Sequence, residues 1–545
     1  MLFLTPESMQ EVDRRTIQGG TPGAVLMHSA GSAVAEETWR AWPRPEWRVV
    51  VLCGAGNNGG DGFVAARELR GRFGAVIACL AGDLGRLAGD ARAAALAYLE
   101  SGGATVSLCG PESLRAELER SDLLIDALLG TGTRGEVRGP LRDLLEVAAA
   151  FEGPIVAVDA PSGLDLRTGH ALGPVPRATL TVTFGAAKLG HALNEGPDLA
   201  GELVVRQIGL DPVALDEAAR RPDSARALDP VEAEALLPLP GRRAHKRSNG
   251  VLAVVAGSRR YAGAATLVCR GALRSGAGLL FAIVPEEQKA GLNASLAEWI
   301  VTGVPAGQDG SLGGPSLAPT RAALAFARPD AIVLGPGLGG GEETTAFVRE
   351  LVGGLAAGSP VLLDADGLNA YAGAEADLRA AASRLVLAIT PHPGELGRLR
   401  GRSARELDED RVEAAREAAR DLGCAVLLKG APTVICAEGR GTLLNPTGNP
   451  GLARGGTGDV LSGLAGGFLA KGLDAFDALG LAAYAHGLAG DLARAELGTL
   501  AMAASDVAER IPRALGALER RETADLLRAL AAEKGRGERG RELPA

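Results

Sequence analysis

An aspartate beside a glycine-rich turn is the first feature of this sequence that could do chemistry. Residues 455–463 read Gly-Gly-Thr-Gly-Asp-Val-Leu-Ser-Gly, and the apolar continuation predicts the first turn of a helix. Bare backbone N–H groups and the helix dipole favour an anion there. Because Asp459 would repel a phosphate, we interpret it as a base acting on a hydroxyl that exchanges a phosphoryl group, with Mg²⁺ easing the repulsion. The alternative is an aspartate that only caps the helix.

Composition limits the classes of protein that need to be considered. The 545 residues carry a net charge of −9, with 46% hydrophobic and 23% charged residues, which predicts two or three globular domains, two being preferred. The basic residues are dispersed, so no nucleic-acid footprint is present. No apolar run reaches the ~18 residues needed to span a membrane. The six cysteines show no metal-ligand spacing and the start lacks a signal-peptide pattern, so we expect a cytoplasmic protein.

Polar loops follow the expected strands of the first half. An apolar strand over residues 47–53 enters a glycine loop at 54–62, and a helix is expected over 63–69. The loop contains Asn57, Asn58 and Asp61. Its glycines satisfy the GxGxxG pattern of Rossmann-like units, but the next strand, 76–81, ends without the acid that holds a ribose in dinucleotide dehydrogenases. Side-chain oxygens in the loop are better suited to a cation or a polyhydroxylated ligand than to phosphate.

Two further strands of this half end in aspartates, Asp126 and Asp159, and Ser162 follows the second. The carboxyl ends of parallel strands meet over one crevice, so these residues and Asn58 could share a site. The alternative is that the acids only cap helices or turns. Lys188 follows another strand and would either face the same crevice or be a surface charge.

These motifs together resemble the YjeF amino-terminal domain, the epimerase of hydrated NAD(P)H, over residues 5 to 210. The resemblance implies a nucleotide site lined by Asn57, Asn58, Gly59, Gly60, Asp61, Gly130, Thr131, Gly132, Thr133, Arg134, Gly135, Glu136 and Asp159. It also implies a potassium ion (K⁺) held by Asn58, Asp126 and Ser162. His28 replaces an acidic residue that is common in the family, and we interpret it as a packing or subunit-contact position.

The second half repeats a unit in which a short apolar strand enters a polar or glycine loop before a helix. This repetition predicts a mostly parallel sheet covered by helices. The loops contain Gly337, Asp364, Asp366, His392 and Lys429. Lys429 can neutralise a nucleotide phosphate, and Asp364 or Asp366 can hold Mg²⁺ through water. His392 would either contact a substrate or be a hydrogen-bonded turn residue.

This succession of loops, ending at residues 455–463, resembles the ribokinase superfamily over residues 226 to 515. The closer resemblance is to its carbohydrate-kinase-like branch, which dehydrates hydrated NAD(P)H with a nucleotide. It implies that Lys429, Gly430, Ala431, Pro432, Thr433 and Gly458 bind the adenine nucleotide and that Ala264, Gly337, His392 and Asp459 contact the hydrate. Arg454 departs from the small or hydroxyl residue usual before the turn. Fused enzymes of this kind are typically bacterial and use ADP, so the resemblance favours ADP over ATP.

We therefore expect an α/β chain of two domains and a tail. The expected parts are a Rossmann-like three-layer sandwich at 1–225, a ribokinase-like three-layer sandwich at 226–520 and a charged, disordered tail at 521–545. A turn-rich stretch at 209–240 marks the junction. We expect a homo-oligomer without nucleic-acid or membrane partners.

The expected substrates are the hydrates of NADH and NADPH (NADHX and NADPHX), together with ADP. The first domain would interconvert the R and S hydrates, with a carboxylate such as Asp159 moving the proton. In the second, Asp459 would deprotonate the S hydroxyl for attack on ADP, giving NAD(P)H, AMP and phosphate. The alternatives are a small-molecule kinase fused to a non-catalytic Rossmann-like module, and a non-catalytic nucleotide sensor.

Overall fold

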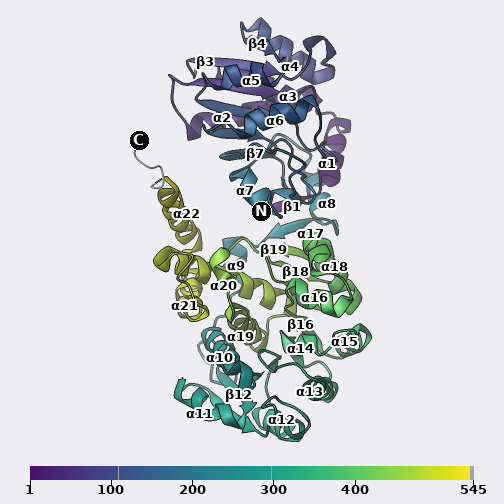
Figure 1. Ribbon diagram of the computed structural model, residues 1–545, viewed down its shortest axis with the longest axis vertical. Coiled ribbons are helices and arrows are strands. Elements are labelled where there is room, and N and C mark those ends of the chain that lie inside the picture. The colour runs from purple at the N-terminus through teal and green to yellow at the C-terminus, as the bar shows by residue number, and fades with distance from the viewer. Residues whose placement is uncertain (109, 296, 540–545) are drawn as a thin grey trace. The chain divides into compact units, whose positions relative to one another are not determined.

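The computed structural model describes residues 1–108, 110–295 and 297–539. The chain divides into two compact units, Met1–Arg226 and the remainder from Ala227 onward, both visible as ribbons in Figure 1. Within the described ranges, no helix combines the length and hydropathy required to cross a bilayer.

The first unit is built around a parallel sheet with strand order β4-β3-β2-β5-β6-β7-β9. β1 lies outside this sheet and pairs with β8 and β10. In chain order the elements are β1 (Leu2–Leu4), α1 (Pro6–Gln18), α2 (Gly23–Ala41), β2 (Arg48–Cys53), α3 (Asn57–Leu69), β3 (Ala75–Leu80), α4 (Gly89–Glu100), β4 (Ala104–Ser107), α5 (Pro111–Leu118), β5 (Leu123–Ala127), α6 (Pro140–Ala149), β6 (Ile155–Val158), β7 (Leu180–Phe184), β8 (Ala187–Lys188), α7 (Gly196–Ala200), β9 (Glu202–Arg206), α8 (Pro212–Ala219) and, at the boundary, β10 (Ala225–Ala227).

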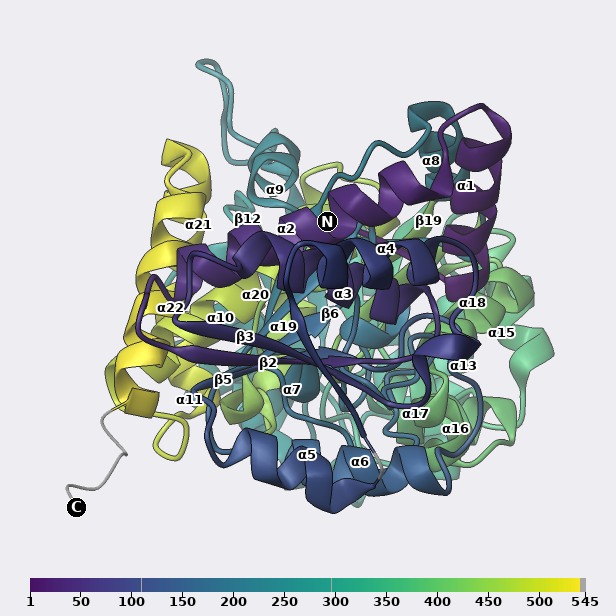
Figure 2. The ribbon, with the colours of Figure 1, turned by 90° about the horizontal axis from the view of Figure 1, so that it is seen from above.

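Helices cover both faces of this first sheet. Figure 2 shows α2, α3 and α4 on one side of β2, β3 and β5, with α5 and α6 on the other. Side chains alternate across a strand, so Val49 and Val51 of β2 pack into one core and Val50 and Leu52 into the other. The expected three-layer sandwich is confirmed, and the nearly continuous apolar strands follow from burial on both faces.

The second unit contains a mostly parallel sheet in which β13-β12-β11-β14-β15-β16-β17 are parallel and β18 and β19 add an antiparallel edge. Its elements are α9 (Pro230–Leu236), β11 (Val251–Val255), α10 (Ala262–Arg274), β12 (Leu279–Pro285), α11 (Glu286–Ser295), β13 (Ile300–Val304), α12 (Gly314–Ala327), β14 (Ala331–Leu334), α13 (Glu342–Gly353), β15 (Pro360–Leu363), α14 (Asp366–Asn369), α15 (Glu375–Ala382), β16 (Val386–Ile389), α16 (Pro393–Arg400), α17 (Ala404–Glu409), α18 (Arg411–Leu422), β17 (Ala425–Leu428), β18 (Val434–Ala437), β19 (Gly441–Leu444), α19 (Thr457–Ala470), α20 (Ala475–Leu497), α21 (Ala504–Arg520) and α22 (Thr523–Arg539). The prediction of a mostly parallel, helix-covered sheet is confirmed.

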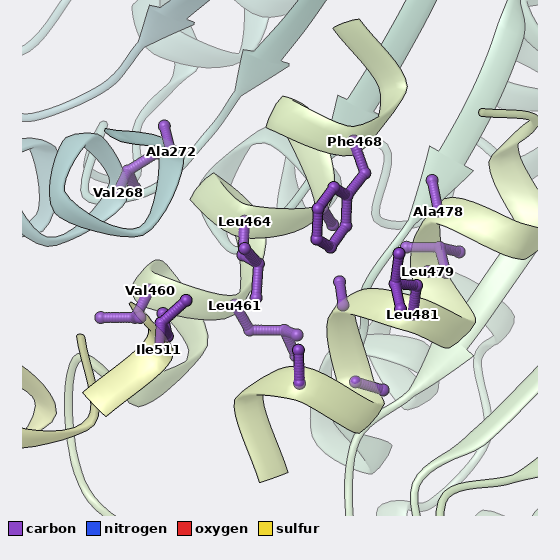
Figure 3. Close-up of a cluster of buried hydrophobic side chains, with 14 of the residues drawn as sticks. Val268, Ala272, Val460, Leu461, Leu464, Phe468, Ala478, Leu479, Leu481 and Ile511 are labelled. Carbon is purple, nitrogen blue, oxygen red and sulfur yellow. The ribbon is translucent and has the colours of Figure 1, made fainter. Parts of the chain in front are cut away.

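The helix that carries Asp459, α19, is almost completely buried. Figure 3 shows side chains of α10, α19, α20 and α21 meeting in one core, with Leu464 and Phe468 among those of α19. α10 and α19 approach closely because glycines face the partner backbone: a Cβ on Gly463 would lie 1.9 Å from the Val268 carbonyl oxygen. This packing fixes the amino-terminal turn of α19, where Asp459 lies.

The glycine loop of the first unit is more helical than expected. α3 begins at Asn57 and not at residue 63, so Asn57 to Asp61 form its first turn. The turn can pack against the end of β2 because Gly59 has no side chain; a Cβ there would lie 1.9 Å from the Gly54 carbonyl oxygen. A spacing of glycines predicts a turn of some kind but not that the helix starts inside it.

The prediction of a disordered tail from residue 521 is wrong for its first part, because α22 begins at Thr523. Leu530 is buried against the core of the second unit, and Leu526 and Leu527 pack on it. An apolar face at helical spacing therefore precedes the charged cluster and holds the helix in place. Residues 540–545 lie outside the described residues.

Candidate active sites

A pocket of about 930 Å³ lies in the first unit, where the loops after its parallel strands converge with α1 and α2. Several elements build its wall: the first turn of α3, the loop after β5, the residue after β6, and β8. The predicted site residues that line it are Asn57, Asn58, Asp61, Gly130, Thr131, Gly132, Thr133, Arg134, Gly135, Glu136 and Asp159. Residues separated by about a hundred positions in sequence thus share one cavity, as expected for parallel strands.

Two predicted residues, Gly59 and Gly60, do not line this pocket. Both are buried in the first turn of α3. Gly59 packs against Gly54, and a Cβ on Gly60 would lie 2.6 Å from atoms of the Met27 side chain. Their role in the described geometry is to allow close packing behind the pocket wall.

Lys188 faces the pocket, which settles the alternative left by the sequence. Its Nζ lies 2.5 Å from Oδ1 of Asp159 and 2.8 Å from Oγ1 of Thr183, and both charged side chains are buried. Burial would raise the pKa of Asp159, but the Lys188 ammonium outweighs burial and lowers it. Burial beside Lys188 also lowers the pKa of His191 to about 4. Asp159 itself has φ +65°, an uncommon conformation for a residue other than glycine.

Oxygen atoms gather beneath the pocket around Asp126, which is fully buried. The Ser162 hydroxyl donates to Asp126 Oδ1 at 2.6 Å, and the Ser162 N–H donates to Oδ2 at 2.8 Å. Asn58 joins the group through its Nδ2, which donates to the Leu129 carbonyl oxygen at 2.8 Å. Burial raises the pKa of Asp126, although the Ser162 hydrogen bonds oppose this shift. A buried carboxylate with hydroxyl and carbonyl oxygens nearby is a donor set that suits a monovalent cation.

The structure adds an acid that sequence reasoning missed. Asp13 lines the pocket from α1, and burial raises its pKa to about 6. The signal was present in the sequence as an acid in helical register with Met9 and Ile17. Asp61 also lines the pocket, and burial together with the Asp159 charge raises its pKa well above the usual value.

His28 is exposed, so it does not take the packing role proposed for it within this unit. Its Nδ1 lies 3.2 Å from Nη2 of Arg67, also at the surface. A subunit contact at this position stays a prediction.

The candidate site of the second unit forms where the loops after β14, β15, β16 and β17 lie side by side. Nζ of Lys429 lies 2.9 Å from Oδ1 of Asp364 and 3.5 Å from Oε2 of Glu395. The Ser462 hydroxyl of α19 donates to Oδ2 of Asp364 at 2.6 Å. Burial lowers the pKa of Lys429, but the two carboxylates outweigh burial and raise it. Glu395 is a member of this site to which the sequence assigned no role.

Asp459 lies in the first turn of α19, beside this cluster. Burial raises its pKa to about 7, the Asp364 charge adds to the shift and Lys429 opposes it. Lys429 is close, because a Cβ on Gly458 would lie 3.6 Å from its Nζ. The structure therefore brings Lys429, Gly458 and Asp459 together, and Asp459 has the pKa expected of a general base that works near neutral pH.

The remaining predicted residues border the same group of loops. A Cβ on Gly337 would lie 2.6 Å from Cβ of Ala264, so these two residues adjoin. His392 caps α16 by accepting from the Gly394 N–H, and its Nε2 lies 3.4 Å from Oε1 of Glu395. Residues 430–433 form the loop that follows Lys429. Arg454 is exposed, and its Nη2 donates to the Leu500 carbonyl oxygen.

The site around Lys429 and Asp459 contains few side chains that could bind a divalent cation. Among the described residues, no group of three or more His, Cys, Asp or Glu side chains is arranged to hold a metal ion. Asp366 accepts the Gly339 N–H at 2.9 Å through Oδ2. Mg²⁺ typically uses only one or two protein carboxylates together with water and substrate phosphates, so either Asp364 or Asp366 could hold such an ion through water.

Comparison with known proteins gives agreeing results for both units. The family model of NAD(P)H-hydrate dehydratases matches residues 252–513, and that of the YjeF-related protein N-terminus matches residues 23–190. A bifunctional NAD(P)H-hydrate repair enzyme of Moorella thermoacetica is 38% identical over 525 residues, covering 95% of this chain and 97% of the relative. The enzyme of the same description from Escherichia coli is 36% identical over 495 residues, covering 90% of this chain and 88% of the relative.

A solved structure is also similar to part of this chain. It is an ADP/ATP-dependent NAD(P)H-hydrate dehydratase from Bacillus subtilis, co-crystallised with ATP and Mg²⁺; it is 31% identical, and the match covers 54% of this chain and 99% of that chain with a TM-score of 0.45. The full-length relatives confirm both family resemblances. Because they span nearly the whole of this chain and of their own, the protein belongs to the family of bifunctional NAD(P)H-hydrate repair enzymes.

Proposed function

We propose that this chain repairs hydrated NADH and NADPH in two steps: it interconverts the R and S hydrates and dehydrates the S form with ADP, releasing AMP and phosphate. The observation that carries this function is the similarity to bifunctional repair enzymes along both units, at 38% identity over 95% of the chain. The two candidate sites support it, because each unit contains a separate cluster suited to one of the reactions.

In the dehydratase site, Asp459 takes the proton from the C6 hydroxyl of the S hydrate. The oxygen attacks the β-phosphorus of ADP, the bond to the α-phosphate oxygen breaks, and AMP leaves. Phosphate then departs from C6 with the bonding electron pair, a proton leaves C5, and NAD(P)H forms. A base with a pKa of about 7 is half ionised at neutral pH, which suits this step.

Positive charge and hydrogen-bond donors at this site support phosphate binding. Lys429 and the backbone around Gly458, at the amino terminus of α19, would hold the ADP phosphates. Asp364 or Asp366 would hold Mg²⁺, which reduces the repulsion between phosphate and attacking oxygen. His392, Ala264 and Gly337 would contact the hydrate, and residues 430–433 the adenine nucleotide.

In the epimerase pocket, the ring nitrogen expels the C6 hydroxyl as hydroxide and an iminium forms. Water adds to the other face of C6 and restores the ring with the opposite configuration. Asp159, kept ionised by Lys188, accepts the proton of the incoming water. Asn58, Asp126 and Ser162 would hold K⁺, which supplies positive charge beside the loops that form the pocket wall. We also propose that the protein forms a homo-oligomer and is located in the cytoplasm.

Product analysis tests the proposed function. The full chain is incubated with purified R or S hydrate of NADH and ADP in H₂¹⁸O, while nicotinamide absorbance is followed. We expect NADH, AMP and phosphate in equal amounts, with oxygen from the hydrate in the phosphate, and ¹⁸O in hydrate that has epimerised. A stable phosphorylated metabolite would identify a kinase instead, and nucleotide binding without turnover would identify a sensor.

A further inference from the structure

One face of α1 forms part of the epimerase pocket and carries an acid that has no assigned role. Met9, Gln10, Asp13 and Ile17 all line the pocket. Met9, Asp13 and Ile17 are four residues apart, and Gln10 precedes Asp13 by three residues, so the four side chains lie on one face of the helix. Asp13 is therefore presented to the cavity by helical geometry.

Contacts at both ends of α1 hold this face in position. Near its start, the hydroxyls of Thr5 and Ser8 donate to Oδ2 of Asp223 at 3.0 and 2.9 Å. Near its end, the Oγ1 atom of Thr16 accepts the Asp211 N–H at 2.9 Å. A side chain on a helix anchored at both ends needs little reorganisation to meet a bound substrate.

Asp13 lacks a partner that would keep it ionised. In the described parts of the chain it forms no ion pair or side-chain hydrogen bond, although Lys188 is close enough to act on its charge. The three protons of the Lys188 ammonium are directed to other acceptors: Oδ1 of Asp159 at 2.5 Å, Oγ1 of Thr183 at 2.8 Å and the Phe184 carbonyl oxygen at 3.3 Å.

Three of the carboxyl groups that line the pocket consequently have different pKa values. Lys188 lowers the pKa of Asp159, whereas burial raises the pKa of Asp61 well above its usual value. Asp13 lies between them: burial raises its pKa to about 6, the Asp159 charge adds to the shift and Lys188 opposes it. Environments that push the pKa values of neighbouring acids apart separate an acid from a base within one site.

We propose that Asp13 is a second catalytic residue of epimerisation, which exchanges a proton with the C6 oxygen of the hydrate while Asp159 does so with water on the other face. This role depends on the proposed epimerase function. As the C6–O bond breaks, its electron pair goes to oxygen, which takes the Asp13 proton and leaves as water, and the nitrogen lone pair forms the iminium. When water adds to C6, the iminium electron pair returns to nitrogen, and Asp159 takes the proton of the added water. Exchange of protons with solvent restores both carboxyl groups.

Epimerisation in either direction requires that Asp13 and Asp159 together carry one proton, with one carboxyl group protonated and the other ionised. This condition holds between the lowered pKa of Asp159 and the pKa of about 6 of Asp13. Epimerisation by the protein should therefore fall as the pH rises through about 6 and beyond. Lys188 and Asp159 act on the charge of Asp13, and Asp13 in turn acts on Asp61. The other charged residues that line the pocket are Asp90, Arg134, Glu136 and Arg138.

The experiment compares Asp13→Asn with the unaltered full chain. R hydrate and excess ADP are supplied, so NADH formation reports epimerisation after the solvent rate is subtracted. S hydrate with the same ADP reports dehydration. We expect Asp13→Asn to lower kcat/KM for epimerisation by about 10²- to 10⁴-fold. The fall of the epimerisation rate through about pH 6 should disappear, and dehydration should be unchanged. Glu11→Gln is the matched control, since Glu11 is on the same helix but pairs with Arg14 at the surface. Glu11→Gln should keep both the epimerisation rate and its fall through about pH 6.

The outcomes separate this role from the function itself. An unaltered chain that does not exceed the solvent rate would exclude the epimerase function. An unaltered chain that epimerises while Asp13→Asn has the same rate and pH profile would exclude the role of Asp13 alone. If thermal unfolding shows that Asp13→Asn does not fold, the unaltered profile decides: a rate that does not fall through about pH 6 would overturn the assignment.

Discussion

Lys429 forms its ion pair with Asp364, at 2.9 Å, and not with Asp459, although it lies close to the turn that carries Asp459. In the described chain Asp459 has no ion-pair partner, so burial and the Asp364 charge act on its carboxyl group with only partial opposition from Lys429. A direct ion pair with Lys429 would lower the pKa of Asp459 further from neutral pH. The pairing of Lys429 with Asp364 is therefore what leaves Asp459 reactive.

Dehydration should depend on the ionised form of Asp459. Because burial raises its pKa to about 7, we expect kcat/KM for the S hydrate to rise with pH through about 7 and to level off above it. Asp459→Asn should lower dehydration by about 10²- to 10⁴-fold. Epimerisation of the R hydrate by the same variant, followed by chromatography, is the internal control. Near-normal ADP-dependent turnover would rule out Asp459 as the base.

Removing Lys429 should change both binding and the pH profile. Lys429→Met takes away a cation that lowers the pKa of Asp459, so the limb of residual dehydration should move to higher pH than in the unaltered chain. ADP should bind more weakly, as measured by calorimetry, because a phosphate loses its counter-charge. If residual dehydration by Lys429→Met rises over the same pH range as in the unaltered chain, Lys429 does not influence the pKa of Asp459.

The buried pair of Lys188 and Asp159 should matter for stability as well as for catalysis. Lys188→Met leaves the Asp159 carboxylate buried and unpaired, which typically costs about 3–5 kcal/mol in the free energy of unfolding. Since Lys188 lowers the pKa of Asp159, its contribution is present above the ordinary aspartate pKa and is lost as the pH falls through the folded pKa. The deficit of the variant should therefore grow from acid to neutral pH.

Tryptophan fluorescence during urea unfolding measures this deficit in the intact chain. Three of the four tryptophans, Trp39, Trp42 and Trp47, belong to the first unit. The double variant Lys188→Met with Asp159→Asn should recover part of the loss, because it removes the uncompensated charge. Equal losses in the single and double variants would show that packing, and not charge, holds this position.

Potassium should stabilise the first unit through Asp126. Burial raises the pKa of this carboxyl group, so its ionised form is costly, and a bound cation would offset that cost. At a K⁺ concentration of 100 times Kd, the gain would be about 2.7 kcal/mol. The Tm followed by tryptophan fluorescence should rise in KCl relative to tetramethylammonium chloride, and the rise should shrink at acid pH as Asp126 protonates. Asp126→Asn should show no such difference; a K⁺ response retained in this variant would place the ion elsewhere.

Two glycines of the first loop should differ in their tolerance of a side chain. A Cβ on Gly54 would lie 2.0 Å from the Leu128 carbonyl oxygen, whereas a Cβ on Gly56 would meet nothing within 4 Å. Gly54→Ala must displace backbone, and overpacking of this kind costs about 1–3 kcal/mol. We expect it to lower the Tm of the first unit, while Gly56→Ala does not. Similar melting curves for the two variants would contradict the close approach of the two loops.

The sequence by itself determined the fold class, and it predicted most of the residues that the structure brings together in the two candidate sites. Aspartates and glycines at the ends of apolar strands carry that information locally. Asp126 lies in the last two residues of such a strand, and Asp159 and Asp364 each follow one. Parallel strands bring their carboxyl ends to one edge. The prediction for Asp459 likewise rested on local sequence, namely one glycine turn and the apolar helix after it. The start of α3 and the helix at Thr523 were missed, because packing against distant residues decided them.

Only the tertiary structure decided which charges meet. Asp13, on α1, reaches the pocket through the folding of a helix that sequence spacing describes merely as amphipathic. Lys188 could have been a surface charge, and its pairing with Asp159 required strands separated along the chain to come together. The pKa values that distinguish these acids depend on burial and on charges far away in sequence, and neither can be read from local spacing.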